Sequence, residues 1–83
     1  MTKQVVYQHK HLPEKALVTS RKGDWVEFYR EDAKVLSYLE SRVFEEAYQE
    51  FLPLDKPLYT SKDLREQRDV TRNQGILVPK EFR

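Results

Sequence analysis

Residues 16–30 read Ala16-Leu-Val-Thr-Ser-Arg-Lys-Gly-Asp-Trp-Val-Glu-Phe-Tyr-Arg30. Two β-prone runs flank Lys22-Gly23, where glycine accepts a positive φ without steric cost, so the stretch predicts a β-hairpin. A two-residue loop there sets the register, and the predicted core face consists of two cross-strand pairs, Leu17 with Phe28 and Thr19 with Val26. The opposite face then carries six other side chains: Ala16, Val18, Ser20, Trp25, Glu27 and Tyr29.

Beyond Arg30 the hydrophobic period changes from alternation to helical spacing. At about 100° per residue the apolar residues of this segment share one arc. They are Ala33, Leu36, Leu39, Val43, Phe44, Ala47, Tyr48 and Phe51. The pattern predicts one long amphipathic helix over residues 32–52, capped by Asp32 and ended by Pro53. Because a small sheet covers only part of such a helix, we expect surplus apolar surface and a homodimer.

The flanking segments complete a predicted α+β fold. Residues 4–8 predict a short strand, and the hairpin places strands at 15–20 and 25–30. A stiff connector with two prolines precedes a second, polar helix over residues 61–73, with Thr60 as its cap and Asp63 in its first turn. Gly75 ends that helix, and residues 76–78 are apolar enough to dock on the fold, with an added strand of the sheet as one form of docking. We therefore expect a single small domain, residues 1–83, with a two- or three-stranded antiparallel sheet packed on the long helix.

Composition favours a soluble protein of the cytoplasm. Hydrophobic residues make up 39% of the 83 residues and charged residues 35%, and there is no cysteine. No apolar run approaches membrane-spanning length, and the N-terminus lacks the features of a secretory signal. The net charge of +1 combines an excess of acidic residues in 31–52 with an excess of basic residues on both sides. These segments can neutralise one another within one chain, so the charge demands no polyanionic partner.

Enzymatic chemistry finds little support in this sequence. Two glycines, Gly23 and Gly75, exclude a glycine-rich phosphate loop, and no serine lies in a nucleophile motif. His9 and His11 have the spacing to face one metal ion from an extended segment, but no third ligand accompanies them at a diagnostic spacing. We predict no enzyme activity, no catalytic residue, no metal and no cofactor.

A protein-interaction or regulatory module is the favoured function. Trp25 and Tyr29 share the outward face of the predicted hairpin, and such aromatic residues are frequent anchors in interfaces. Glu40 falls inside the apolar arc of the predicted helix, where a carboxylate needs a partner or fixes the register of an interface. These three residues are the predicted contacts with a protein partner or with a second copy of the chain.

A nucleic-acid-binding accessory protein is the alternative. On the second helix Lys62, Arg65, Arg68 and Arg72 lie within an arc of about 120°, and Lys10 adds a basic residue near the N-terminus. Asp63, Glu66 and Asp69 offset this charge, so a solvated, internally paired helix face is the simpler interpretation. A third reading, an inhibitor whose acidic helix imitates phosphate charge, depends on the excess of acidic residues in 31–52.

One segment resembles a known group of proteins. It reads Gly23-Asp-Trp-Val-Glu-Phe-Tyr-Arg-Glu-Asp-Ala-Lys-Val-Leu-Ser-Tyr-Leu-Glu40. The pattern is similar to that of small bacteriophage and prophage accessory proteins, in which a hairpin strand leads through an acidic cap into a long helix. The resemblance implies a mobile-element protein that binds host or phage macromolecules without catalysis. It transfers no functional residue.

Overall fold

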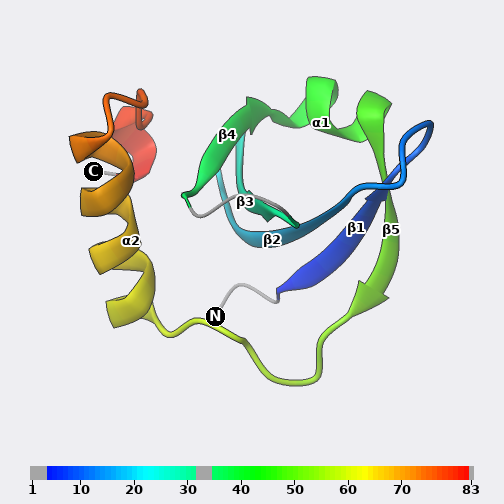
Figure 1. Cartoon of the computed structure of the whole chain (residues 1–83), viewed down its shortest axis with the longest axis horizontal. Helices are drawn as coiled ribbons and strands as arrows, with labels where there is room; N and C mark the ends of the chain where they lie inside the picture. Colours follow the sequence, from blue (N-terminus) through cyan, green and yellow to red (C-terminus); the bar gives the residue numbers. More distant parts are fainter. Residues whose placement is uncertain (1–3, 32–34, 83) are drawn as a thin grey trace.

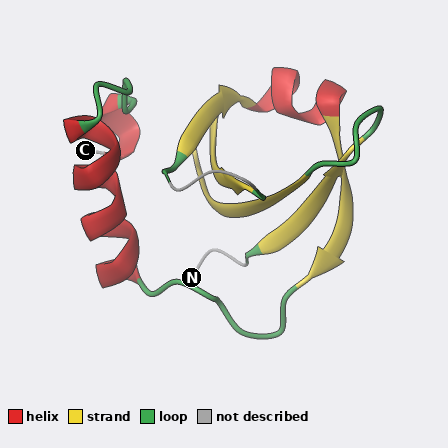
Figure 2. Ribbon diagram, viewed as in Figure 1, coloured by secondary structure: helices red, strands yellow, loops and turns green. Residues whose placement is uncertain are grey.

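Five strands form a single antiparallel sheet in the order β4-β3-β2-β1-β5 in the computed structural model, which describes residues 4–31 and 35–82. The strands are β1 (Val5–His9), β2 (Lys15–Lys22), β3 (Trp25–Arg30), β4 (Ser37–Glu40) and β5 (Tyr48–Pro53). The sheet curves, and helix α1 (Ser41–Ala47) joins β4 to β5 across its concave side (Figure 1). Helix α2 (Ser61–Asn73) stands beside the sheet, near β3 and β4 (Figure 2). The predicted α+β class is confirmed, but the sheet has five strands where two or three were expected.

The main core lies on the concave, inner face of the sheet. Its buried members come from four strands and α1: Tyr7, Ala16, Val18, Val26, Phe28, Phe44 and Tyr48. The Phe44 ring stacks on Tyr48 at 4.7 Å between centroids and lies 5.0 Å from both Tyr7 and Phe28. A short helix thus closes the concave face with a single large side chain.

The hairpin is confirmed, but its predicted register is wrong. Lys22 is opposite Trp25, so the loop is Gly23-Asp24, with Gly23 at φ +58°. The register also shifts between Val18 and Ser20, a β-bulge that places one extra residue, Thr19, in β2. A one-residue shift exchanges the two faces of a strand. Ala16 and Val18 therefore join Val26 and Phe28 in the core, whereas the predicted core residues Leu17 and Thr19 lie on the outer face.

The long helix predicted over residues 32–52 is wrong. Its described part contains β4, the seven-residue α1 and β5, and the expected cap Asp32 lies outside the described residues. Both new strands pair with edges that the hairpin and β1 leave free, β4 with β3 and β5 with β1. Backbone hydrogen bonds to those edges, together with β-prone residues such as Tyr38 and Tyr48, outweigh the helical spacing of the apolar residues.

The second helix is confirmed at its predicted bounds. Thr60 accepts a hydrogen bond from the Asp63 amide, and the Asp63 carboxylate accepts one from the Thr60 amide, which completes a capping box. Gly75 follows the helix at φ +85°. The tail docks as predicted through buried Val78, but residues 76–78 form no strand, and a short 3-10 helix, η1 (Lys80–Phe82), follows. Within the described part of the chain, no helix has the length and apolar character needed to cross a membrane.

Candidate functional site

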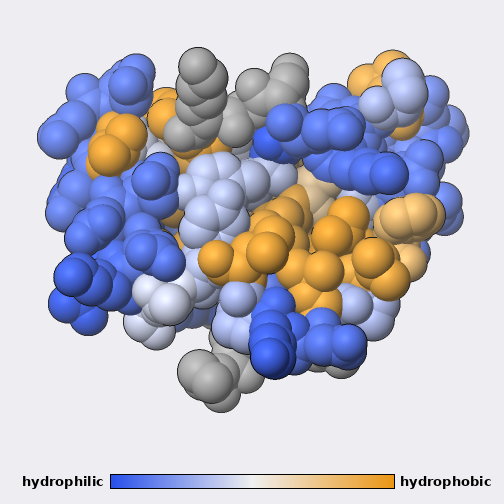
Figure 3. Space-filling view, turned by 60° about the horizontal axis from the view of Figure 1, so that its bottom comes forward, coloured by the Kyte–Doolittle hydropathy of each residue, from blue (hydrophilic) through white to orange (hydrophobic). Residues whose placement is uncertain are grey.

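The outer face of the sheet carries a row of apolar side chains across four strands. Leu52 of β5 is opposite Val6 of β1, Val6 is also opposite Leu17 of β2, and Leu17 is opposite Tyr29 of β3. We call these four residues the apolar row. Val6, Leu17 and Tyr29 are half-buried, and Leu52 is 51% exposed. Figure 3 shows a continuous apolar area on the face of the molecule that includes this side of the sheet.

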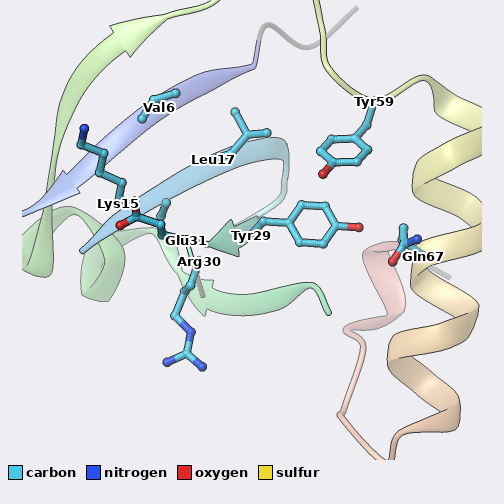
Figure 4. Close-up of a pocket in the computed structure, with 9 residues that line it drawn as sticks. Val6, Lys15, Leu17, Tyr29, Arg30, Glu31, Tyr59 and Gln67 are labelled. Carbon is cyan, nitrogen blue, oxygen red and sulfur yellow. The ribbon is translucent and has the colours of Figure 1, made fainter. Parts of the chain in front are cut away.

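Two tyrosines form one end of the row. The Tyr29 ring packs against Tyr59 of the segment before α2, with centroids 4.9 Å apart, and the two lie side by side in Figure 4. The Tyr29 hydroxyl is buried and makes no hydrogen bond to any described residue. Its burial, and then the nearby Tyr59, raise the pKa of Tyr29 above its ordinary value.

Gln4 fixes Tyr59 in this position. Its side-chain amide donates to the Tyr59 carbonyl at 2.9 Å, and its side-chain oxygen accepts from the Leu58 amide at 2.7 Å. Gln4 is itself buried, so these hydrogen bonds are shielded from water. The segment between β5 and α2 therefore lies in a defined place at the border of the apolar row.

A groove of about 450 Å³ follows the apolar row from Val6 to Tyr59 (Figure 4). Two charged residues, Lys15 and Glu31, line it beside the apolar ones, whereas the Arg30 side chain, opposite the core residue Ala16, points away from the row (Figure 4). Lys15 has no carboxylate within 4.0 Å among the described residues. The groove thus combines an apolar floor with one cation that no described residue neutralises at contact distance.

Phe51 extends this surface to the edge of the sheet. The register of β1 and β5 shifts between Val6 and Tyr7, which leaves Phe51 as an extra residue in β5. The Phe51 ring is 53% exposed, and the Lys15 ammonium lies 4.9 Å from its centroid. An exposed phenylalanine and an exposed leucine are therefore adjacent in sequence on an edge strand.

The other half of the outer face is covered by α2 through a buried polar cluster. Glu27 of β3 is fully buried, and its carboxylate accepts two hydrogen bonds from Arg68, at 2.6 Å and 2.9 Å. The Tyr38 hydroxyl donates to it at 2.7 Å and the Thr19 hydroxyl at 2.9 Å. We call Thr19, Glu27, Tyr38 and Arg68 the Glu27 cluster. Four donors satisfy the carboxylate, which explains how a charge persists without contact with water.

The cluster also changes the protonation of its members. The hydrogen bonds from Arg68 to Glu27 hold the pKa of the guanidinium above its ordinary value, although burial opposes this. Burial, and then the hydrogen bond to Glu27, raise the pKa of Tyr38. The phenol therefore stays a neutral donor throughout the ordinary pH range.

The predicted partner contacts do not form one site. Trp25 is opposite Glu40 at the end of the sheet where α1 begins, whereas Tyr29 belongs to the apolar row. Trp25 and Tyr29 are both half-buried. Glu40 is exposed on β4. The prediction that it lies inside the apolar arc of a long helix is therefore wrong.

The predicted basic stripe is also divided. Arg68 points into the Glu27 cluster, and Arg72 forms an ion pair with Asp69. Lys62 and Arg65 are exposed on α2, while Lys10 lies in the loop between β1 and β2, at the far side of the sheet (Figure 1). Two of the five basic residues are therefore free on one helix, and the fifth is remote from them.

The His9 side chain stabilises a turn. The Nδ1 atom of His9 accepts hydrogen bonds from the amides of His11 and Leu12, both at 3.1 Å. Across residues 4–31 and 35–82, no three His, Cys, Asp or Glu side chains are grouped so as to hold a metal ion.

The sequence reasoning missed the Glu27 cluster and most of the apolar row. An acidic residue in the middle of the run Trp25-Val-Glu-Phe-Tyr29 is a signal of a buried partner, but it does not reveal which cation approaches. The apolar row depends on the register of three strand pairs. One of these pairs includes β5, most of which was predicted to be helical. Comparisons of the chain with family models, with curated proteins and with solved structures gave no match.

Proposed function

We propose that this chain is a non-enzymatic protein-interaction module that binds an apolar segment of a partner protein on the apolar row. The observation that carries the proposal is the alignment of Val6, Leu17, Tyr29 and Leu52 across four strands, on a face that α2 covers only in part. Apolar side chains that are aligned and accessible lose water when a partner covers them, which favours association.

Charge complementarity defines the partner further. Lys15 lines the groove along the row and lacks a carboxylate partner at contact distance among the described residues. An acidic side chain beside the apolar residues of the partner supplies this missing charge. The proposed occupant is therefore an apolar segment that carries at least one Asp or Glu.

Selection from a random peptide display library tests this occupant. We expect the selected peptides to combine apolar residues with an acidic residue and to lose about tenfold or more in affinity for the variants Leu17→Glu and Leu52→Glu. Val43→Glu is the matched control, because Val43 is also exposed but lies on α1, at the concave side of the sheet. Circular dichroism of each variant checks that it is folded.

Three results decide between versions of the proposal. Peptides that bind Leu52→Glu as tightly as the native chain contradict the apolar row as the contact surface. If Trp25→Ala is the one variant that weakens binding, the contact surface lies at the end of β3 near Glu40. A dimer in light scattering that Leu52→Glu dissociates identifies a second copy of the chain, and not another protein, as the occupant.

The nucleic-acid alternative has less support, because Arg68 and Arg72 are paired within the chain. It requires binding to a DNA duplex that weakens steeply with added salt and depends on Lys62 and Arg65. The absence of binding at low salt excludes it. A cytoplasmic location and a bacteriophage origin are further expectations of this proposal. The expected bacteriophage origin depends on segment 23–40, which ends in β4 and not in a helix.

A further inference from the structure

A second groove, of about 850 Å³, separates α2 from β2. One wall is β2, with Ser20 and Lys22 among its lining residues, and the other is α2, with Leu64, Arg65 and Arg68. The segment between β5 and α2 forms the floor and contributes Leu54, Pro57 and Tyr59. This groove does not include Val6, Leu17 or Leu52, so it is distinct from the apolar row, although Tyr59 borders both.

Cations reach the groove from both walls. Lys22 and Arg65 have no carboxylate within 4.0 Å among the described residues, whereas the charge of Arg68 is satisfied by Glu27. Asp55 is the one acidic residue among the described residues that line the groove. The Lys22 ammonium lies 5.6 Å from the centroid of the Phe82 ring, a contact that supplies no negative charge. An anion between Lys22 and Arg65 would therefore meet two positive charges without carboxylate partners, from opposite sides.

A serine hydroxyl adds a donor at the same place. Ser20 is only 7% exposed, lines the groove and precedes Lys22 by two residues on the same strand face. Its hydroxyl makes no hydrogen bond to another described residue, and it is not one of the fully buried polar atoms, so it keeps some exposure. It can therefore donate to a ligand oxygen in the groove.

The floor has a different character. Leu54, Pro57, Tyr59 and Leu64 present apolar and aromatic surface below the cations. A ligand that fits both parts carries an anionic group at one end and a flat apolar body at the other.

We propose that this groove binds a phosphate monoester on an aromatic body, with the phosphate between Lys22 and Arg65 and the body against Tyr59. Phosphate suits this end because its several oxygens accept from an ammonium, a guanidinium and a hydroxyl at once. Nucleoside monophosphates and phosphorylated tyrosine share this chemistry. The inference is independent of the protein-interaction function.

Titration of the full chain with adenosine monophosphate and with O-phosphotyrosine, followed by amide NMR shifts and by Trp25 fluorescence, tests the proposal. Trp25 is opposite Lys22 in the hairpin and is the one tryptophan of the chain, so its emission reports on this wall of the groove. We expect at least one of the two ligands to bind with a Kd below about 1 mM and to shift the amides of Ser20 and Arg65. Adenosine alone and inorganic phosphate alone should each bind at least about tenfold more weakly, since each lacks one half of the ligand.

Matched variants locate the site. Lys22→Gln and Arg65→Gln should each weaken binding by about tenfold, while Lys62→Gln should leave it unchanged, because Lys62 is exposed on α2 and does not line the groove. The proposal is overturned if neither ligand binds with a Kd below about 1 mM. It is equally overturned if inorganic phosphate binds as tightly as the esters, or if Lys62→Gln weakens binding as much as Arg65→Gln.

Discussion

The two faces of this sheet are covered in different ways. On the inner face, aromatic rings from three strands and α1 pack against one another and exclude water, and only the hydroxyls of Tyr7 and Tyr48 among these rings make hydrogen bonds to described residues. On the outer face, α2 is held by hydrogen bonds to a buried carboxylate, together with a few buried apolar side chains such as Leu64 and Val78. The comparison teaches that apolar burial stabilises the sheet itself, whereas a directional polar cluster sets where the helix sits and leaves the apolar row uncovered.

The largest expected effect belongs to the inner face. Phe44→Ala should lower the free energy of unfolding by about 3–5 kcal/mol, because Phe44 is fully buried and contacts three other rings. Urea denaturation followed by circular dichroism measures the change. Phe51→Ala is the matched control, and a similar loss in that exposed position would contradict the assignment of the core.

A smaller and more local effect is expected on the outer face. Arg68→Ala leaves the Glu27 carboxylate buried without its cation and should cost about 3 kcal/mol. Hydrogen exchange should show the loss of protection first in α2, with β1 to β3 still protected. Arg65→Ala serves as the control, since Arg65 is exposed on the same helix. Uniform loss of protection across the sheet would show that the two faces are not separable.

The double variant Glu27→Leu with Arg68→Met sharpens the same comparison. Replacement of both charged groups by apolar side chains of similar size should restore most of the stability that Arg68→Ala removes. Stability that stays as low as in Arg68→Ala would show that the Glu27 cluster stabilises α2 through its hydrogen-bond geometry and not only by avoiding an unpaired charge.

The cap of α2 contributes less. Thr60→Ala removes the acceptor for the Asp63 amide and should cost about 1 kcal/mol. Chemical shifts of the first turn of α2 report the fraying directly. Ser61→Ala, one residue further, is the control and should be nearly neutral.

The smallest effect at ordinary pH concerns the buried tyrosines. The pKa values of Tyr29 and Tyr38 are raised by burial, so the folded chain favours the neutral phenols. Their contribution is fully present below the unfolded pKa of about 10 and is lost as the pH rises above it. Thermal unfolding should therefore show a Tm that falls above pH 10, and less steeply in Tyr29→Phe with Tyr38→Phe. An equal slope in that variant would contradict the burial of these hydroxyls.

Local chemistry allowed part of the fold to be predicted from the sequence. The strands at Val5–His9, Lys15–Lys22 and Trp25–Arg30 follow from β-prone runs around a glycine turn. Helix α2 follows from a capping box at Thr60 and a terminating glycine at Gly75, which act within a few residues of the chain. The sequence predicts such local structures because both partners of each interaction lie close together in the chain.

Only the tertiary structure decided the segment 37–53, the hairpin register and the two candidate binding surfaces. The apolar spacing from Leu36 to Phe51 fits a helix, yet the free edges of β3 and β1 offer backbone hydrogen bonds that a sequence pattern does not display. The bulge at Thr19 then determines which side chains face outward. The apolar row and the groove beside α2 consist of residues up to 64 positions apart, so their existence depends on long-range pairing and on the Arg68–Glu27 contact.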